Sequence, residues 1–197
     1  EDTGSRNVAI GRDALRDLNF NGSGFNVAVG HNAGLTMTSG VQNTVVGGLA
    51  GDALTTGAGN TVMGYNALSG EDTGSRNVAI GFESLKVQNY NGNAYNVAIG
   101  YIAGQTMTTG IQNTLIGSLS GNALTTGAAN VAVGYGALGT EDAHGRNVAI
   151  GHNSLATLNA GADGDNVAVG YYAMQAVTTG VNNTSVGSLS MGVGVTT

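Results

Sequence analysis

The stretch Asn77-Val78-Ala79-Ile80-Gly81 decides the fold, because it recurs along the whole chain as N-[VT]-x-[VIM]-G. One 19-residue interval between copies is followed by three 17-residue intervals, and this set then starts again, which defines a larger super-repeat. Residues 1–11, EDTGSRNVAIG, return unchanged at 71–81 and as EDAHGRNVAIG at 141–151. A fixed period of about 20 residues is typical of a solenoid, in which each repeat forms one coil that stacks on the next.

One coil, residues 43–59, predicts the local structure. Asn43-Thr44-Val45-Val46-Gly47 is rich in β-branched residues and indicates a short strand, and Leu49-Ala50 indicates a second one between glycine turns. Glycine every few residues disfavours helix. We therefore expect all-β structure over 1–197, a parallel β-solenoid or β-roll of about eleven coils and about 50 Å in length. It would be a single segment of a longer fibre protein, with super-repeats starting near residues 1, 71 and 141.

The composition excludes several classes of partner. Only six residues are basic and the net charge is −6, so we expect no binding to nucleic acid, whose phosphates require clustered lysine and arginine. No apolar run approaches the roughly 20 residues that a membrane-spanning helix needs, so we expect no membrane insertion in this segment. The chain has no cysteine, which removes disulfides and thiolate metal sites.

The first residue of the motif is asparagine in every copy. Side-chain amides stacked at the spacing of strands can form hydrogen-bonded ladders, so we predict a structural rather than a ligand-binding role for this column. Its members are Asn7, Asn26, Asn43, Asn60, Asn77, Asn96, Asn113, Asn130, Asn147, Asn166 and Asn183.

The predicted strand is largely apolar on both faces. Valine or threonine follows the asparagine, then alanine, valine or leucine (serine once), then isoleucine, valine or methionine. Adjacent strand residues point to opposite faces, so a thin solenoid leaves one apolar face to be covered, and other copies of the chain are its natural cover. We therefore predict a homo-oligomer, in which small residues suit close approach around a symmetry axis: Ala9, Ala28, Ala79, Ala98, Ala132, Ala149 and Ala168.

The 19-residue coils carry longer loops at 19–25, 89–95 and 159–165. Loops on a rigid scaffold are common sites of recognition. The first two contain an aromatic pair each, so Phe20, Phe25, Tyr90 and Tyr95 are the candidate contacts for a cell-surface glycan or receptor. The alternative is that the loops are insertions without a function. A second aromatic column follows the motif glycine and includes Tyr65, Phe82 and Tyr101. We expect these rings to cover neighbouring coils, with sugar binding as the alternative.

Charged residues gather beside the long loops, as Glu1-Asp2 with Arg6, Glu71-Asp72 with Arg76, and Glu141-Asp142 with Arg146. We expect solvated turns with weak surface ion pairs there. The three histidines and the carboxylates form no recognisable catalytic or zinc-binding pattern, and calcium needs more oxygen ligands than such a pair offers. We therefore predict no enzyme, and neither catalytic, cofactor-binding nor metal-binding residues.

The extended motif N-[VT]-x-[VI]-G-x-x-[AS] resembles the head repeat of YadA-type trimeric autotransporter adhesins. Residues 60–68 and the Leu-Thr-Thr-Gly at 54–57 and 124–127 also resemble phage tail-fibre repeats. The resemblance implies a left-handed parallel β-roll, three chains packed around an axis, and motif position three facing the interior of the trimer. The 17-residue and 19-residue coils are longer than those of the adhesin heads, which favours the phage fibre.

The leading hypothesis is therefore a structural and adhesive segment, a phage tail-fibre shaft that takes part in host attachment and is located in the virion. The alternative is a bacterial trimeric adhesin at the cell surface. Two further hypotheses have less support. A glycan-degrading spike would need a facing pair of carboxylates. An ice-binding solenoid would use threonines that here adjoin turn glycines: Thr38, Thr55, Thr56, Thr108, Thr109, Thr125, Thr126, Thr178 and Thr179.

Overall fold

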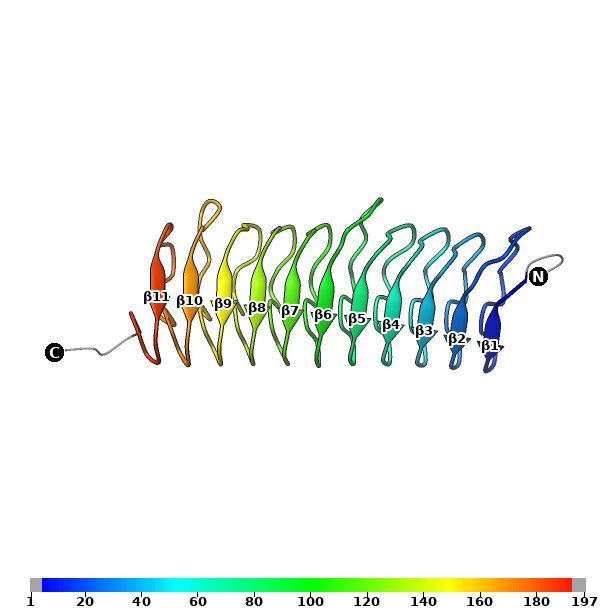
Figure 1. The fold of residues 1–197 in the computed structure, drawn as a ribbon, viewed down its shortest axis with the longest axis horizontal. Coiled ribbons are helices and arrows are strands. Elements are labelled where there is room, and N and C mark those ends of the chain that lie inside the picture. The colour runs from blue at the N-terminus through cyan, green and yellow to red at the C-terminus, as the bar shows by residue number, and fades with distance from the viewer. Residues whose placement is uncertain (1–4, 193–197) are drawn as a thin grey trace.

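The computed structural model describes residues 5–192, which wind into a rod of stacked coils (Figure 1). Every motif copy forms one three-residue strand, and the described residues contain no helix. The strands form a single parallel sheet in sequence order, so each coil pairs with the one before and the one after it. Their bounds are Val8–Ile10 (β1), Val27–Val29 (β2), Thr44–Val46 (β3), Thr61–Met63 (β4), Val78–Ile80 (β5), Val97–Ile99 (β6), Thr114–Ile116 (β7), Val131–Val133 (β8), Val148–Ile150 (β9), Val167–Val169 (β10) and Thr184–Val186 (β11).

The register keeps each motif position in line with itself. Val78 pairs with Val97, Ala79 with Ala98 and Ile80 with Ile99, and the other coils follow the same rule. This register confirms the solenoid that the repeat predicts. It follows from the period, because equal positions in successive coils come to lie one above another along the rod.

The middle residue of each strand from β2 to β10 is fully buried inside the coil of its own chain. Ala28, Val45 and Ala79 have no exposed surface, and they belong to one core with leucines and methionines such as Leu85 and Met107. The prediction that the alanines approach a symmetry axis, and that motif position three faces other chains, is therefore wrong. Alanine suits this position because the coil is thin and the large leucines fill the interior from the opposite wall.

The wall opposite the sheet is built from turns, so the predicted second strand is wrong. Residues with left-handed backbone alternate there with others, as at Asn66 (φ 58°) and Leu68 (φ 49°). The wall still bonds to its neighbours, because Asn66 N–H donates to the carbonyl of Gly48 in the coil before and Leu68 N–H to that of Ser84 in the coil after. Alternating dihedrals therefore satisfy the backbone polar groups without an extended strand.

The motif glycine closes each strand at a close approach between coils. At Gly81 φ is +134°, and a Cβ atom there would lie 2.2 Å from the carbonyl oxygen of Gly100. A side chain is therefore excluded by both the backbone conformation and the neighbouring coil. The same approach is found at Gly64, whose Cβ would lie 2.3 Å from the carbonyl oxygen of Gly81.

Candidate functional site

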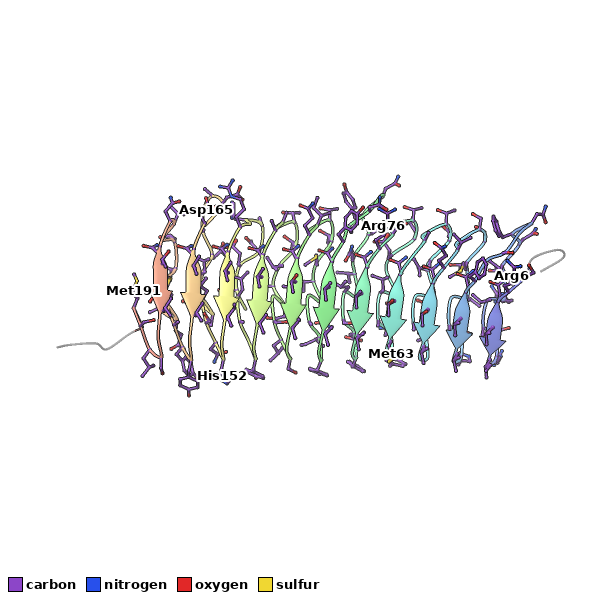
Figure 2. All side chains as sticks on the ribbon, viewed as in Figure 1. Arg6, Met63, Arg76, His152, Asp165 and Met191 are labelled. Atoms are coloured by element: carbon purple, nitrogen blue, oxygen red, sulfur yellow. The ribbon has the colours of Figure 1, made fainter. Side chains whose placement is uncertain are left out.

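The loops of the 19-residue coils project from one edge of the rod, before β2, β6 and β10 (Figure 1). The first two loops join the coil before them, because Ser5 and Ser75 form parallel bridges with Ser23 and Asn93. In the third loop, the N–H of Gly164 donates to the carbonyl of Gly145 in the coil before it. Figure 2 shows Arg76 and Asp165 at this edge, and Met63 and His152 at the opposite edge, where the strands end. The rod therefore presents two distinct edges, which we call the loop edge and the strand-end edge.

A buried glutamate supports the loop at 89–95. Glu71 has no exposed surface, and its Oε1 accepts a hydrogen bond from the N–H of Gly74 at 2.7 Å. Its Oε2 accepts one at 3.2 Å from the N–H of Tyr90, which lies in the loop. Burial raises the pKa of Glu71, and the hydrogen bonds from the amides of Tyr90 and Gly74 offset only part of this effect. The prediction of a solvated turn is wrong for this residue.

Glu141 takes the same place in the next super-repeat and is equally buried. It accepts hydrogen bonds from the N–H groups of His144 and Ala160, both at 3.1 Å, and its Oε1 lies 3.3 Å from the Nδ1 atom of His144. Ligand atoms of Glu141, Asp142 and His144 lie within 4.8 Å of one another. Both oxygens of Glu141 already accept backbone hydrogen bonds, so the cluster fits loop support and we assign it no metal. Glu1 and Asp2, their counterparts in the first super-repeat, lie outside the described residues.

The structure divides the aromatic pairs that the sequence singles out. Phe20 and Tyr90 are half-buried, and Phe20 packs against the core. Phe25 and Tyr95 are about half exposed, at 51% and 47%. An arginine lies over each exposed ring, with Arg6 Cζ 5.2 Å from the ring centre of Phe25 and Arg76 Cζ 5.4 Å from that of Tyr95. The loop edge therefore offers an arginine beside an aromatic ring in two of its three loops.

The third loop keeps the arginine and replaces the ring. Arg146 forms ion pairs with Asp165 at 2.7 Å and with Asp163 at 3.5 Å, and all three side chains are about half exposed. No aromatic residue stands in the loop at 159–165. The three loops thus share their place on the rod and differ in the chemistry that they present to solvent.

The asparagine column forms a buried ladder of amides. The Oδ1 atom of Asn43 accepts hydrogen bonds from the backbone N–H of Asn60 at 2.9 Å and from its side-chain Nδ2 at 3.1 Å. The same Nδ2 donates to the carbonyl oxygen of Gly74 at 2.9 Å. In the longer coil, Gln88 bridges the ladder by donating to Asn77 and accepting from Asn96, both at 3.2 Å. The column therefore consists of structural residues.

Aromatic rings line the strand-end edge in two stacks of three. Tyr65, Phe82 and Tyr101 form the first, with ring centres 5.6 and 5.4 Å apart. The second has centres 5.2 and 5.4 Å apart and consists of Tyr135, His152 and Tyr171. The rings cover their neighbours along the rod, as the sequence predicts. Their outer edges remain open to solvent, since Tyr101 is 55% and Tyr135 49% exposed.

The outward face of the sheet is apolar. It presents the first and third residues of every strand, which are valine or threonine and then valine, isoleucine or methionine. The middle strands keep Met63 45% and Ile116 38% exposed, and Ile150 near one end is 38% exposed. Residues 5–192 contain no pocket, so the surfaces that could contact a partner are this face and the two edges.

The comparisons with known proteins give no match that would assign a role to these surfaces. No protein-family model matches the chain, and neither curated proteins nor solved structures give a match. Among the described residues no helix is long and apolar enough to cross a membrane. Function therefore rests on the geometry of the chain itself.

Sequence reasoning missed the two buried glutamates, although a signal for them was present. Both glutamates begin the same Glu-Asp pattern at the start of a super-repeat. The regular return of a charged residue that precedes a longer coil indicates a structural partner inside that coil.

Proposed function

We propose that this chain is a structural and adhesive segment of a fibre, a phage tail-fibre shaft that takes part in host attachment. Its copies pack side by side through the outward face of the sheet, as a trimer of left-handed coils. The fibre belongs to the virion, and its loop edge meets the surface of the host cell.

The single observation that supports this proposal is the apolar outward face. It runs along all eleven strands with no charged residue in them, and it includes Met63 and Ile116, which are 45% and 38% exposed. Monomeric soluble proteins rarely expose a continuous apolar patch of more than a few hundred Å². A parallel sheet is ordinarily covered on both faces, and here the chain covers only one. Further copies of the same rod have the matching length and repeat.

Light scattering on the purified segment tests the packing. We expect a mass three times that of the 19.5 kDa chain, which persists on dilution. Ile116→Glu with Met63→Glu places two charges on the outward face and should dissociate the assembly. Asn93→Glu, on an exposed loop residue, is the matched control and should leave the mass unchanged. A folded monomer in the unaltered protein would overturn the proposal.

Attachment is tested by incubating labelled protein with a panel of bacterial cells. We expect saturable binding to some strains, and a loss of at least tenfold in Phe25→Ala with Tyr95→Ala, because these rings are exposed at the loop edge. Arg16→Ala, an exposed residue outside the loops, should bind normally. Binding to no strain on the panel, or binding that the loop variants leave unchanged, would contradict an adhesive role for the loop edge.

A bacterial surface adhesin remains the second candidate, because its repeat motif is similar and the same apolar face would serve its trimer. The greater length of the coils in this chain favours the phage fibre. Sequencing the flanking gene distinguishes the two, since a chaperone domain downstream indicates a phage fibre and a membrane-anchor barrel indicates an adhesin.

A further inference from the structure

The aromatic column of the strand-end edge is interrupted at two small residues, Gly48 and Ser118. Ser118 separates the two three-ring stacks, so Tyr101 stands in the coil before it and Tyr135 in the coil after it. Gly48 separates His31 from Tyr65 in the same way. The two interruptions occupy equivalent positions in successive super-repeats. We call these two places the ring gaps.

Each ring gap has the width of one ring. Tyr101 and Tyr135 stand two coil steps apart, so at the spacing of strands their rings lie about 10 Å apart. A ring placed midway would be about 5 Å from each of them. The chain's own rings stack at nearly that distance, 5.2 to 5.6 Å between centres. The gap therefore reproduces the geometry of the existing ladder with one member missing.

The space at the first gap is open at its base. A Cβ atom added at Gly48 would meet only the ring of Tyr65, at 3.6 Å, which is ordinary van der Waals contact. The backbone of Gly48 is not in the left-handed region, so a side chain there would not be strained. A leucine follows each small residue, Leu49 and Leu119, and both are only partly buried. Each gap is thus open, flanked by aromatic faces and next to an apolar side chain.

We propose that each ring gap binds one neutral sugar ring in its pyranose form, held between the two aromatic faces. The negative face of an aromatic ring attracts the polarised C–H groups of a sugar. The hydroxyls of Tyr101, Tyr135 and Ser118 offer hydrogen bonds to the rim of the sugar. The chain carries a net charge of −6, and the one lysine or arginine in this column, Arg12, stands two coil steps before Gly48, so a neutral sugar is favoured over an anionic one.

Two gaps on one rod lie about 20 Å apart, four coils from each other. A polysaccharide that reaches both would bind with a gain in avidity, since the second contact becomes intramolecular. This inference names a ligand class for the adhesive role and in that respect rests on the proposed function. Its site is the strand-end edge, whereas the candidate loops lie on the loop edge.

Filling the gaps tests the inference without damage to the fold. The unaltered protein is titrated with methyl glucopyranoside, methyl galactopyranoside and maltohexaose, and binding is followed by saturation-transfer NMR. We expect saturable binding to at least one probe. Gly48→Tyr with Ser118→Tyr completes the ladder, so the variant should keep or raise its Tm and lose at least tenfold in affinity. Asn93→Tyr adds a ring on the opposite edge and should bind as the unaltered protein does.

Three results would overturn the inference: no saturable binding to any of the probes, equal affinity in the filled variant, or binding of p-cresol in place of sugars. The last result would show that the gap accepts an aromatic side chain of another molecule. The mass is measured on the same samples. A monomer that binds the pyranosides would contradict the fibre proposal and support sugar binding in the ring gaps. A trimer that binds none of the probes would support the fibre packing and contradict sugar binding in the ring gaps.

Discussion

The loops at 89–95 and 159–165 have the same support and different tips. In each, a buried glutamate in the coil before the loop accepts a hydrogen bond from a loop amide, Tyr90 N–H at 3.2 Å or Ala160 N–H at 3.1 Å. At the tips, Arg76 lies over the ring of Tyr95, whereas Arg146 forms an ion pair with Asp165. On its exposed side, the loop at 89–95 is therefore held by a cation–π contact together with a hydrogen bond from Arg76 Nη1 to the Tyr95 hydroxyl, and the loop at 159–165 is held by an ion pair.

This difference shows which positions the fold constrains. The glutamate binds the backbone N–H, so the side chain at that loop position is free to be tyrosine or alanine. The tip is exposed, and a surface pair contributes little to stability. The scaffold therefore depends on contacts to backbone amides in the interior, and the residues at the tips are free to vary.

The largest loss of stability is expected at the motif glycines, where successive coils approach most closely. Gly81→Ala places a Cβ atom 2.2 Å from the carbonyl oxygen of Gly100, in a backbone conformation that alanine rarely adopts. Strain and overpacking together should lower the free energy of unfolding by about 3–5 kcal/mol, measured by chemical denaturation. Gly161→Ala, in the tip of the third loop, meets nothing within 4 Å and should be nearly neutral. Equal losses in the two variants would mean that scaffold and tip are not distinct.

The next effect separates interior from tip asparagines. Asn113→Ala removes the acceptor of Asn130 N–H, at 2.9 Å, and the donor to the carbonyl of Gly127, at 2.9 Å. Leaving these buried groups unsatisfied should cost about 2–3 kcal/mol in the free energy of unfolding. Asn93→Ala, on an exposed loop residue, should change it by less than about 0.5 kcal/mol. A similarly small change in the free energy of unfolding at both positions would show that the asparagine ladder does not stabilise the fold.

The same division explains how much the sequence reveals. The strand, its parallel register and the asparagine column follow from a period that places equal residues above one another. The turn wall does not, because leucines such as Leu68 adopt left-handed backbone that their type disfavours, and only contacts between coils impose it. The direction of the alanines is mispredicted for a related reason. Alternation gives two faces, and which one is interior depends on the large residues of the opposite wall.

The candidate site was predictable in position and not in detail. The longer coils indicate projecting loops, and these do project from one edge. That Tyr90 is half-buried while Tyr95 is exposed depends on how the loop folds over Glu71, which no spacing in the sequence reveals. A buried glutamate is also unexpected from composition, because charged residues are rarely fully buried without a partner. Here the partners are backbone amides, so the only mark in the sequence is the return of Glu-Asp at the start of each super-repeat.

A change of pH probes the support itself. The pKa of Glu71 is raised in the folded chain, so its contribution to stability is fully present below the ordinary value of 4.5 and is lost as the pH rises through the raised pKa. The Tm of the unaltered protein should therefore rise relative to that of Glu71→Gln as the pH falls from 7 to 4. Each unit of raised pKa corresponds to about 1.4 kcal/mol.

Glu83→Gln is the control with the opposite sign. The hydrogen bond from Lys86 lowers the pKa of Glu83, so its contribution is present above 4.5 and is lost as the pH falls through the lowered pKa. The Tm of the unaltered protein should therefore fall relative to that of Glu83→Gln over the same pH range. Parallel Tm curves for the two glutamine variants would show that Glu71 does not titrate as a buried group.

The smallest effect lies at the tips and distinguishes their two kinds of contact. Double-mutant cycles of Arg146 with Asp165, and of Arg76 with Tyr95, should each give a coupling energy of about 0.5–1 kcal/mol in 0.05 M salt. In 1 M salt the screening length falls to about 3 Å, so the coupling of Arg146 with the exposed Asp165 should largely vanish. The coupling of Arg76 should persist in greater part, because half of the Tyr95 ring is covered and the contact includes a hydrogen bond from Arg76 Nη1 to the Tyr95 hydroxyl and apolar surface as well as charge. If both couplings vanish together, the ring contributes only through electrostatics, and the two tips are equivalent in kind despite their different residues.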